Sequence, residues 1–382
     1  MNKRNISGKN IKVNYINSIY NKVQTLIYNI LTLMIESKIL ISLSSTFFII
    51  ASCSLIDRSY LSNFDKLHYI LYILFFISTL VIYNLHKKYN SLILFTKSIQ
   101  QHKLIHKITP AKFINNKALL ASFGILVVVT LFLFVLIDLL SNRFFVDSNH
   151  SIFNIIIFFV KFLLPIGIIS LLYSIPFFPD YRKKYINLSS NNDYLLRLKD
   201  LPFIKLFLIS FVWAYNSILP IYIQEYIYHP DIIPNYFDFS YNYLVLLIFL
   251  QNLIFVIAIT LPFDIRDKAY DKERGIITIP NYFDLNSNNV SIILMIIVIL
   301  FSISSYLLFN IYSITQLLIL TIFDIRIIFT LKKYIFNNEN SGINQELNSN
   351  KRFTNFWQKY YFYGVLDGVI LIRSFLILLF AL

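Results

Sequence analysis

Apolar stretches of about 20 residues recur along this chain, separated by polar segments. A helix of that length crosses a hydrocarbon layer of roughly 30 Å, where no water is present to satisfy backbone polar groups. The pattern therefore predicts about nine membrane-spanning helices. Their expected bounds are Ile39 to Ile56, Leu67 to Tyr83, Ala118 to Leu140, Ile152 to Phe177, Phe203 to Ile223, Tyr241 to Phe263, Val290 to Leu308, Ile311 to Leu331 and Tyr361 to Leu382.

The start of the chain differs from these stretches. Its first residues are polar and basic, which is not the pattern of a cleavable signal peptide. The segment from Tyr20 to Leu40 is partly apolar but is interrupted by Lys22 and Glu36, a pattern that favours a helix lying at the membrane interface. We therefore expect a cytoplasmic or interfacial segment over residues 1–38 and one transmembrane helical domain over residues 39–382.

Composition agrees with this pattern. Of the 382 residues, 57% are hydrophobic and only 14% are charged. One water-soluble core cannot enclose so large an apolar fraction, so lipid is the expected surrounding. The predicted fold class is all-α, that of a polytopic integral membrane protein.

The formal net charge of +14 resembles that of a nucleic-acid-binding protein, but the distribution of the charge does not. With nine spans and the N-terminus inside, the basic residues concentrate in the segments expected on the cytoplasmic side. The connections expected outside contain only three Lys or Arg residues, Arg58, Lys66 and Arg143. We therefore expect a bacterial inner-membrane protein whose N-terminus and functional surface face the cytoplasm, with membrane lipid and no nucleic acid as its partner.

The most informative polar segment is LPFDIRDKAYDKERGIITIP, at the end of the sixth predicted span. Asp264, Asp267 and Asp271 recur there at three- and four-residue spacing, so on a helix they share one face. Neighbouring carboxylates repel one another unless a cation neutralises them, and oxygen ligands suit Mg²⁺ that bridges to a diphosphate. Arg266 and Arg274 are placed to hold the same phosphate oxygens. The alternative is a solvated helix end whose charges form local pairs of little energetic value.

This part of the chain resembles the second aspartate motif of the UbiA-type membrane prenyltransferases. The residues that carry the resemblance are the segment DIRDKAYD, which begins at Asp264, and the later Gly275 and Thr278. The resemblance implies nine transmembrane helices arranged as two four-helix repeats plus one. It also implies transfer of an isoprenoid chain from a diphosphate donor to a lipophilic acceptor, with Mg²⁺ as the cofactor that holds the diphosphate. By the same resemblance Asp267 and Asp271 are the metal-binding pair, and Asp264 stands where many members have Asn.

The first motif of that family, of the form NDxxDxxxD, is expected at the cytoplasmic end of the second span, where this chain reads YNLHKKYNSL. Asn84 matches the leading Asn, whereas Leu85, Lys88 and Leu92 stand in place of the aspartates. The presence of Lys87 and Lys88 in this motif has two alternative explanations. In the first, their ammonium groups neutralise a diphosphate directly. In the second, they are part of a cytoplasmic loop that is basic because of the positive-inside rule.

The first functional hypothesis is a divergent UbiA-like prenyltransferase that transfers a polyprenyl group from a diphosphate donor to a lipophilic acceptor. Asp264, Asp267 and Asp271 are the expected Mg²⁺ ligands, and the last two are the expected catalytic residues. The expected diphosphate contacts are Asn84, Lys88, Arg266 and Lys205, of which Lys205 lies just inside the fifth span.

Two other classes of function compete with this hypothesis. The degenerate first motif favours a non-catalytic relative that binds an isoprenoid or quinone lipid, and an ion pair of Lys88 with Asp267, filling the metal site, would support it. The intramembrane charges Lys161, Asp367 and Arg373 prompt a membrane transporter, although no broken-helix pattern demands one. Asp367 and Arg373 do not share a helix face, so each needs a partner elsewhere, and Lys161 is a candidate for Asp367.

Overall fold

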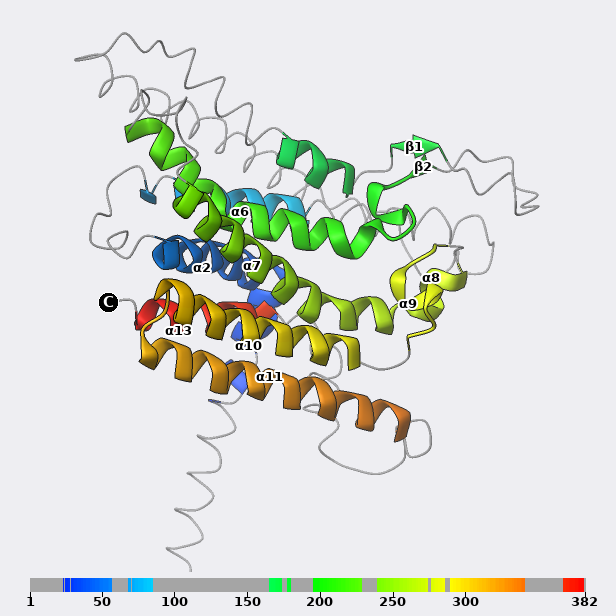
Figure 1. The fold of residues 1–382 in the computed structure, drawn as a ribbon. Helices are drawn as coiled ribbons and strands as arrows, with labels where there is room; N and C mark the ends of the chain where they lie inside the picture. Colours follow the sequence, from blue (N-terminus) through cyan, green and yellow to red (C-terminus); the bar gives the residue numbers. More distant parts are fainter. Residues whose placement is uncertain are drawn as a thin grey trace, which may run out of the picture.

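The computed structural model of the chain describes residues 23, 25–27, 29–56, 68–69, 71–84, 165–173, 177–179, 195–228, 239–273, 276–285, 289–340 and 367–380. These residues are mainly helical (Figure 1). The helices are α2 (Ile39–Ile56), η3 (Leu198–Asp200), α6 (Ile204–Tyr228), α7 (Phe239–Arg266), α8 (Lys268–Glu273), α9 (Ile279–Tyr282), α10 (Asn289–Phe309), α11 (Ile314–Asn340) and α13 (Asp367–Leu379). Two strands, β1 (Phe178–Pro179) and β2 (Leu195–Leu196), form a small antiparallel pair.

Five of the described helices are long and apolar enough to cross a membrane, which makes the chain an integral membrane protein. They are α2, α10 and the parts Ile204–Ile223 of α6, Tyr243–Arg266 of α7 and Ile314–Leu331 of α11. The helix Leu71–Asn84, at the second predicted span, is shorter. Of the fourth predicted span only residues 165–173 are described as helix, and the third span, 118–140, lies outside the described residues. The prediction of nine spans therefore stays a prediction.

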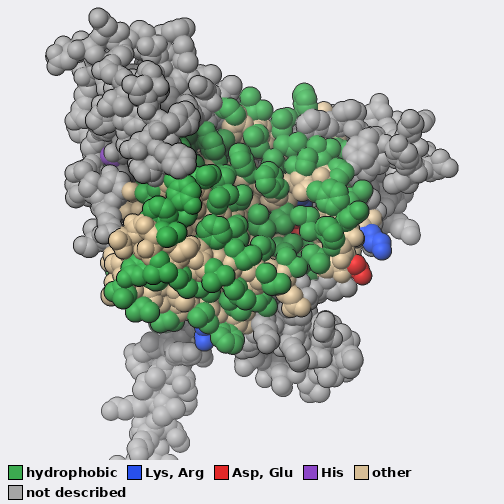
Figure 2. Space-filling view, viewed as in Figure 1, with side chains coloured by type: hydrophobic (Ala, Val, Ile, Leu, Met, Phe, Trp, Pro, Cys, Tyr) green, Lys and Arg blue, Asp and Glu red, His purple; other side chains and the backbone are tan. Residues whose placement is uncertain are grey.

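Six helices pack in a closed ring in the order α2, α6, α7, α10, α11 and α13, with α13 returning to α2 (Figure 1). A hydrophobic cluster inside the ring takes a side chain from every member: Ile41, Trp213, Phe255, Met295, Ile327 and Ile370. Within the ring α10 and α11 leave most of their apolar side chains for lipid, whereas α2 is buried on most sides. Figure 2 shows the result, a face covered largely by hydrophobic side chains, with charged ones beside α8 and α9 at its right margin.

Polar side chains inside the ring join helices to one another. The amide of Asn252 on α7 donates hydrogen bonds to Ser52 Oγ on α2 and Ser217 Oγ on α6, each over 2.9 Å. Gln251 donates to Ser302 Oγ on α10 over 2.7 Å and accepts a hydrogen bond of 3.1 Å from Tyr312. Because no water competes for these groups in a lipid interior, the bonds fix which helix faces meet.

One end of the bundle is closed by short polar segments, and we call it the charged end, defined by Lys205, Asp264 and Asp271. Here the backbone N–H of Phe203 donates to the carbonyl of Ile277 over 3.0 Å, which ties the start of α6 to the segment between α8 and α9. Phe203 has a positive φ of 62°, uncommon for a residue with a side chain. Its ring lies edge-on to that of Tyr282, 5.2 Å away. The segment before α6 is thereby held against α9 and the residues just before it.

Candidate functional site

A cavity of about 550 Å³ lies inside the bundle and reaches the charged end. Its walls come from α2, α6, α7, α13 and the helical residues 71–84 and 165–173. Away from the charged end the lining is mostly apolar and aromatic, with Phe48, Ile49, Val212, Trp213, Val256 and Ile259 among its residues. A site of this size and lining suits an elongated apolar ligand with a polar head.

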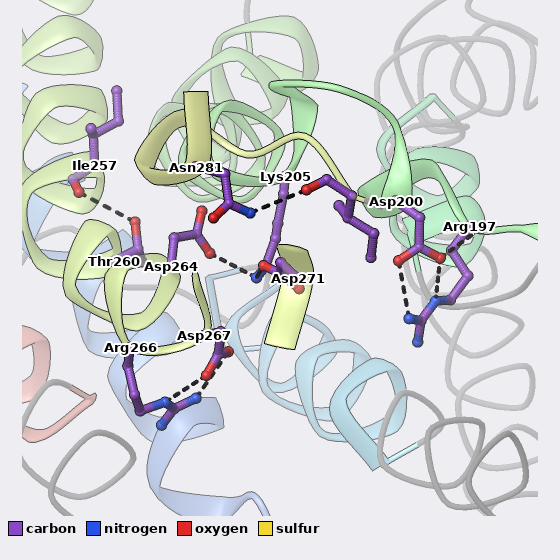
Figure 3. A network of polar contacts seen from close by, with 11 residues as sticks. Arg197, Asp200, Lys205, Ile257, Thr260, Asp264, Arg266, Asp267, Asp271 and Asn281 are labelled. Carbon is purple, nitrogen blue, oxygen red and sulfur yellow. Dashed lines mark hydrogen bonds and ion pairs between the residues drawn. The ribbon is translucent and has the colours of Figure 1, made fainter. Parts of the chain in front are cut away.

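At the charged end the ammonium of Lys205 lies between two carboxylates (Figure 3). Its Nζ is 2.8 Å from Asp264 Oδ1 and 3.2 Å from Asp271 Oδ2. The side chains of Asp264 and Asp271 are only 5% and 7% exposed, and that of Lys205 is 18% exposed. The second oxygen of Asp264 is buried and has no hydrogen-bond partner among the described residues. The three groups form an ion triad that is largely withdrawn from solvent.

The end of α7 explains how two aspartates reach the same lysine. Pro262 has no N–H to complete the helical hydrogen bonds, and α7 stops at Arg266. Asp267 forms the turn before α8, yet the N–H of Asp271 still donates to the carbonyl of Asp267 over 2.8 Å. The helical path is thus nearly continuous, and residues seven apart, two turns along, face the same side.

Asp267 has a different partner from the other two aspartates. The guanidinium of the adjacent Arg266 donates to both of its oxygens, over 2.7 and 3.1 Å. Both side chains are about one-third exposed, and Arg266 also lies over the ring of Phe263, 5.5 Å from its centroid. The three aspartates that were expected to share one face therefore separate: Asp264 and Asp271 are buried against Lys205, and Asp267 forms a partly exposed pair with Arg266 at the rim of the cavity.

A second buried ion pair, Arg197 with Asp200, borders the same cavity and was not predicted from the sequence. Arg197 donates to Asp200 from Nε, Nη2 and its backbone N–H, over 2.9 to 3.1 Å, and so closes the single turn of η3. Burial raises the pKa of Asp200, but the hydrogen bonds and positive charge of Arg197 outweigh it and leave the pKa below its usual value. The sequence signal was a basic residue three positions before an acidic one, which occurs too often to single out a site.

Two aromatic side chains meet at the cavity wall. Trp213 Nε1 lies 3.3 Å from Tyr83 Oη, and both residues line the cavity. The next residue, Asn84, donates its amide hydrogens to the carbonyls of Ser37 and Leu80, over 3.2 and 2.9 Å. Asn84 therefore links the helix 71–84 to the chain before α2, beside the cavity wall.

The structure brings together most of the residues expected at a diphosphate site. Asp264, Asp267, Asp271, Lys205 and Arg266 all line the cavity. Of the other expected diphosphate contacts, Asn84 is not among the residues that line the cavity, and Lys88 lies outside the described residues, as does Arg274. The ion pair of Lys88 with Asp267 that would support a non-catalytic relative is therefore not tested.

The two charged residues of the last predicted span, Asp367 and Arg373, lie in different surroundings. Arg373 Nε donates to Asp324 Oδ1 on α11 over 3.1 Å, and its guanidinium lies 4.5 Å from the ring centroid of Phe255. Asp367 lines the cavity, and its carbonyl accepts a hydrogen bond from Ser44 Oγ over 2.7 Å. Lys161, the candidate partner of Asp367, lies outside the described residues. The partner that Arg373 needed is therefore an aspartate of a neighbouring helix.

Magnesium does not fit the charged end in the arrangement observed. In the described part of the chain no three His, Cys, Asp or Glu side chains converge as a metal site. The space between Asp264 and Asp271 is taken by the Lys205 ammonium, and Asp267 is turned to Arg266. Mg²⁺ binding by the three aspartates remains a prediction from the sequence.

The sequence matches no family model and no curated protein. Among solved structures, a digeranylgeranylglyceryl phosphate synthase studied in membranes is similar to the chain, with a TM-score of 0.45 and 14% sequence identity. The similarity covers 92% of this chain and 97% of that one. A TM-score below 0.5 does not establish a shared fold.

Proposed function

We propose that the chain is a divergent UbiA-like prenyltransferase, which binds a polyprenyl diphosphate in the cavity and transfers the prenyl group to a lipophilic acceptor. The observation that carries the proposal is one cavity with an apolar, aromatic wall and a charged end, enclosed among membrane helices. The isoprenoid tail would lie along the wall near Phe48 and Trp213, and the diphosphate would lie at Lys205. The aspartate motif that resembles the family stands at that same end.

The reaction breaks the bond between the allylic carbon and the diphosphate oxygen, and the diphosphate leaves with the electron pair. The acceptor supplies the pair for the new bond and loses a proton. Positive groups placed where negative charge develops on the leaving group would favour the first step. Lys205 and Arg266 are the candidates for this role, and the apolar wall would exclude water from the allylic cation.

The balance of charges favours a second candidate function. The described lining residues include five basic side chains, Lys38, Arg197, Lys199, Lys205 and Arg266, and five acidic ones, Asp200, Asp264, Asp267, Asp271 and Asp367. With no formal net charge, this lining does not by itself attract a diphosphate. A lipid with a neutral polar head, such as a quinone or a prenyl alcohol, fits it as it stands. We therefore keep a non-catalytic isoprenoid-binding protein as the alternative.

The transporter hypothesis has less support. A transporter would need its intramembrane charges to line a continuous aqueous route, but Arg373 is buried in an ion pair with Asp324. That pair joins two helices of the ring, so packing already accounts for it.

A binding experiment separates the two leading candidates. The purified full-length protein in detergent is titrated with farnesyl diphosphate and with farnesol, which share a tail and differ in the head, each with and without Mg²⁺. Preference for the diphosphate without Mg²⁺, lost in Lys205→Met but not in Asp271→Ala, supports the transferase, because Lys205 supplies the positive charge and Asp271 competes for it. Release of diphosphate in the presence of a membrane lipid extract then tests turnover. In the same assay, Asp267→Ala measures how much the ion pair of Arg266 with Asp267 contributes to ligand affinity.

Asp284→Ala is the matched control, because that aspartate is exposed and lies away from the cavity. Equal or stronger binding of farnesol would transfer the proposal to the non-catalytic alternative. Failure of both ligands to bind to protein shown to be folded would reject the cavity as an isoprenoid site.

A further inference from the structure

The position of Lys205 carries an inference about which cation this site uses. We propose that the Lys205 ammonium is the resident cation of the charged end and holds the place that the aspartate pattern assigns to a divalent metal. The inference concerns the site of the proposed function, but it does not require that the chain transfer prenyl groups.

The first support is geometric. One ammonium is within hydrogen-bond distance of two carboxylates that belong to different helices, α7 and α8. Two buried carboxylates repel each other strongly in a medium of low dielectric constant, so they need a cation between them. Lysine suits this role, because its charge is compact and its long stem can reach across helices.

The second support is that the triad is held in place. Lys205 is the second residue of α6, and α6 packs along α7. The hydrogen bond from Phe203 to Ile277 fixes the chain just before α6 to the chain just after α8. The ammonium therefore approaches the two carboxylates from a fixed helix end rather than from a surface loop.

The third support is the charge that remains. One ammonium and two carboxylates sum to a formal charge of −1, and the second oxygen of Asp264 is buried without a partner in the described structure. The site thus retains an oxygen able to bind a cation, while the ammonium fills the position between the carboxylates. Removing the ammonium without shortening the side chain would leave a carboxylate pair that can accept a divalent cation.

The test is Mn²⁺ binding to the purified full-length protein in detergent, with no prenyl ligand present. The free Mn²⁺ is read from its electron paramagnetic resonance signal. Lys205→Met keeps the length of the side chain and removes the charge, so it should bind Mn²⁺ roughly tenfold more tightly than the wild type, or better. Adding Asp271→Asn to Lys205→Met should abolish the gain.

Lys199→Met is the matched control. Lys199 also lines the cavity, but it lies over the ring of Tyr173, 5.5 Å from the centroid, so its loss should leave Mn²⁺ affinity as in the wild type. Equal Mn²⁺ affinity in folded wild type and folded Lys205→Met would overturn the proposal. So would a wild type that already binds Mn²⁺ tightly and loses it in Asp264→Asn, a result that needs no lysine variant to fold.

The outcomes also distinguish this inference from the proposed function. If the wild type binds no farnesyl diphosphate while Lys205→Met gains Mn²⁺ affinity, the transferase proposal fails and the resident cation stands. If the wild type binds both Mn²⁺ and farnesyl diphosphate tightly, the resident cation fails and the transferase gains support.

Discussion

Arg373 and Asp324 are oppositely charged side chains that are both almost completely buried, with exposed fractions of 3% and 1%. One oxygen of Asp324 and one nitrogen of Arg373 have no hydrogen-bond partner within the described structure. Neither charge can leave the interior without unpacking α11 from α13, which are neighbours in the ring. Each of these two charges is therefore tolerated in the interior only while the other one is present.

Asp324→Leu is therefore expected to destabilise the protein strongly. It strands the Arg373 charge in the interior, and breaking a buried pair in this way costs about 3–5 kcal/mol. Asp324→Leu combined with Arg373→Met removes both charges and should recover most of the loss. Thermal unfolding in detergent measures both variants, and equal destabilisation in the single and double variants would contradict the argument.

Single residues also mark where sequence reasoning succeeded and failed. The aspartate motif drew attention to Asp264 and Asp271, which the structure places together in the cavity. Their common partner Lys205 is some 60 residues earlier in the chain, and only the packing of α6 on α7 brings it there. Periodicity describes one helix at a time, so it could not reveal this contact.

At the scale of the element, hydropathy located helices well because it follows from the cost of exposing backbone and polar groups to lipid. The first predicted span, Ile39 to Ile56, has the bounds of α2, and the seventh differs from α10 by one residue at each end. The end of α7 was less predictable, since the helix continues past Phe263 to Arg266 and carries the motif with it. Polar helix ends are set by local hydrogen bonds rather than by hydropathy.

The single turn η3 gives a prediction that depends on pH. Arg197 lowers the pKa of Asp200 in the folded protein, so the contribution of this carboxylate to stability is complete above its unfolded pKa of about 3.9. That contribution is lost as the pH falls through the lower, folded pKa. Asp200→Asn should lower the melting temperature at pH 7, and the difference from the wild type should shrink below about pH 4.

The control for this pH series is a carboxylate that is paired but exposed to solvent. Asp284 pairs with Lys268 but is exposed, so Asp284→Asn should change the melting temperature little at any pH. A difference between Asp200→Asn and the wild type that stays constant down to pH 3 would show that the charge of Asp200 is not what stabilises η3.

At the scale of the whole molecule, α13 completes the bundle. Ile370 belongs to the cluster inside the ring, Ile377 to a second cluster with Tyr312, and Leu371 packs on a third beside Leu40. Hydropathy predicted this last span but not that it packs against the first, because the order of helices in a ring follows from contacts between faces. The ring exists only when α13 is in place.

The same substitution, isoleucine to alanine, at a buried and at an exposed position of α13 tests which face of this helix packs into the bundle. Ile370 is 3% exposed and Ile372 is 49% exposed on the same helix. Ile370→Ala should lower the free energy of unfolding by about 2–5 kcal/mol, since it leaves a cavity in the core, whereas Ile372→Ala should change it little. Unfolding in detergent measures both, and similar losses at the two positions would mean that α13 does not pack as described.

The contact of α13 with α2 also sets an order of events during synthesis. A ribosome that has just released α2 into the bilayer must still translate roughly 300 residues before α13 emerges, which takes about 15 to 60 s at ordinary rates. Throughout that interval Ser44 of α2 lacks the carbonyl of Asp367 on α13, which accepts its hydrogen bond in the folded protein. The ring of described helices therefore stays open on the side of α2 and α11 until α13 has been made.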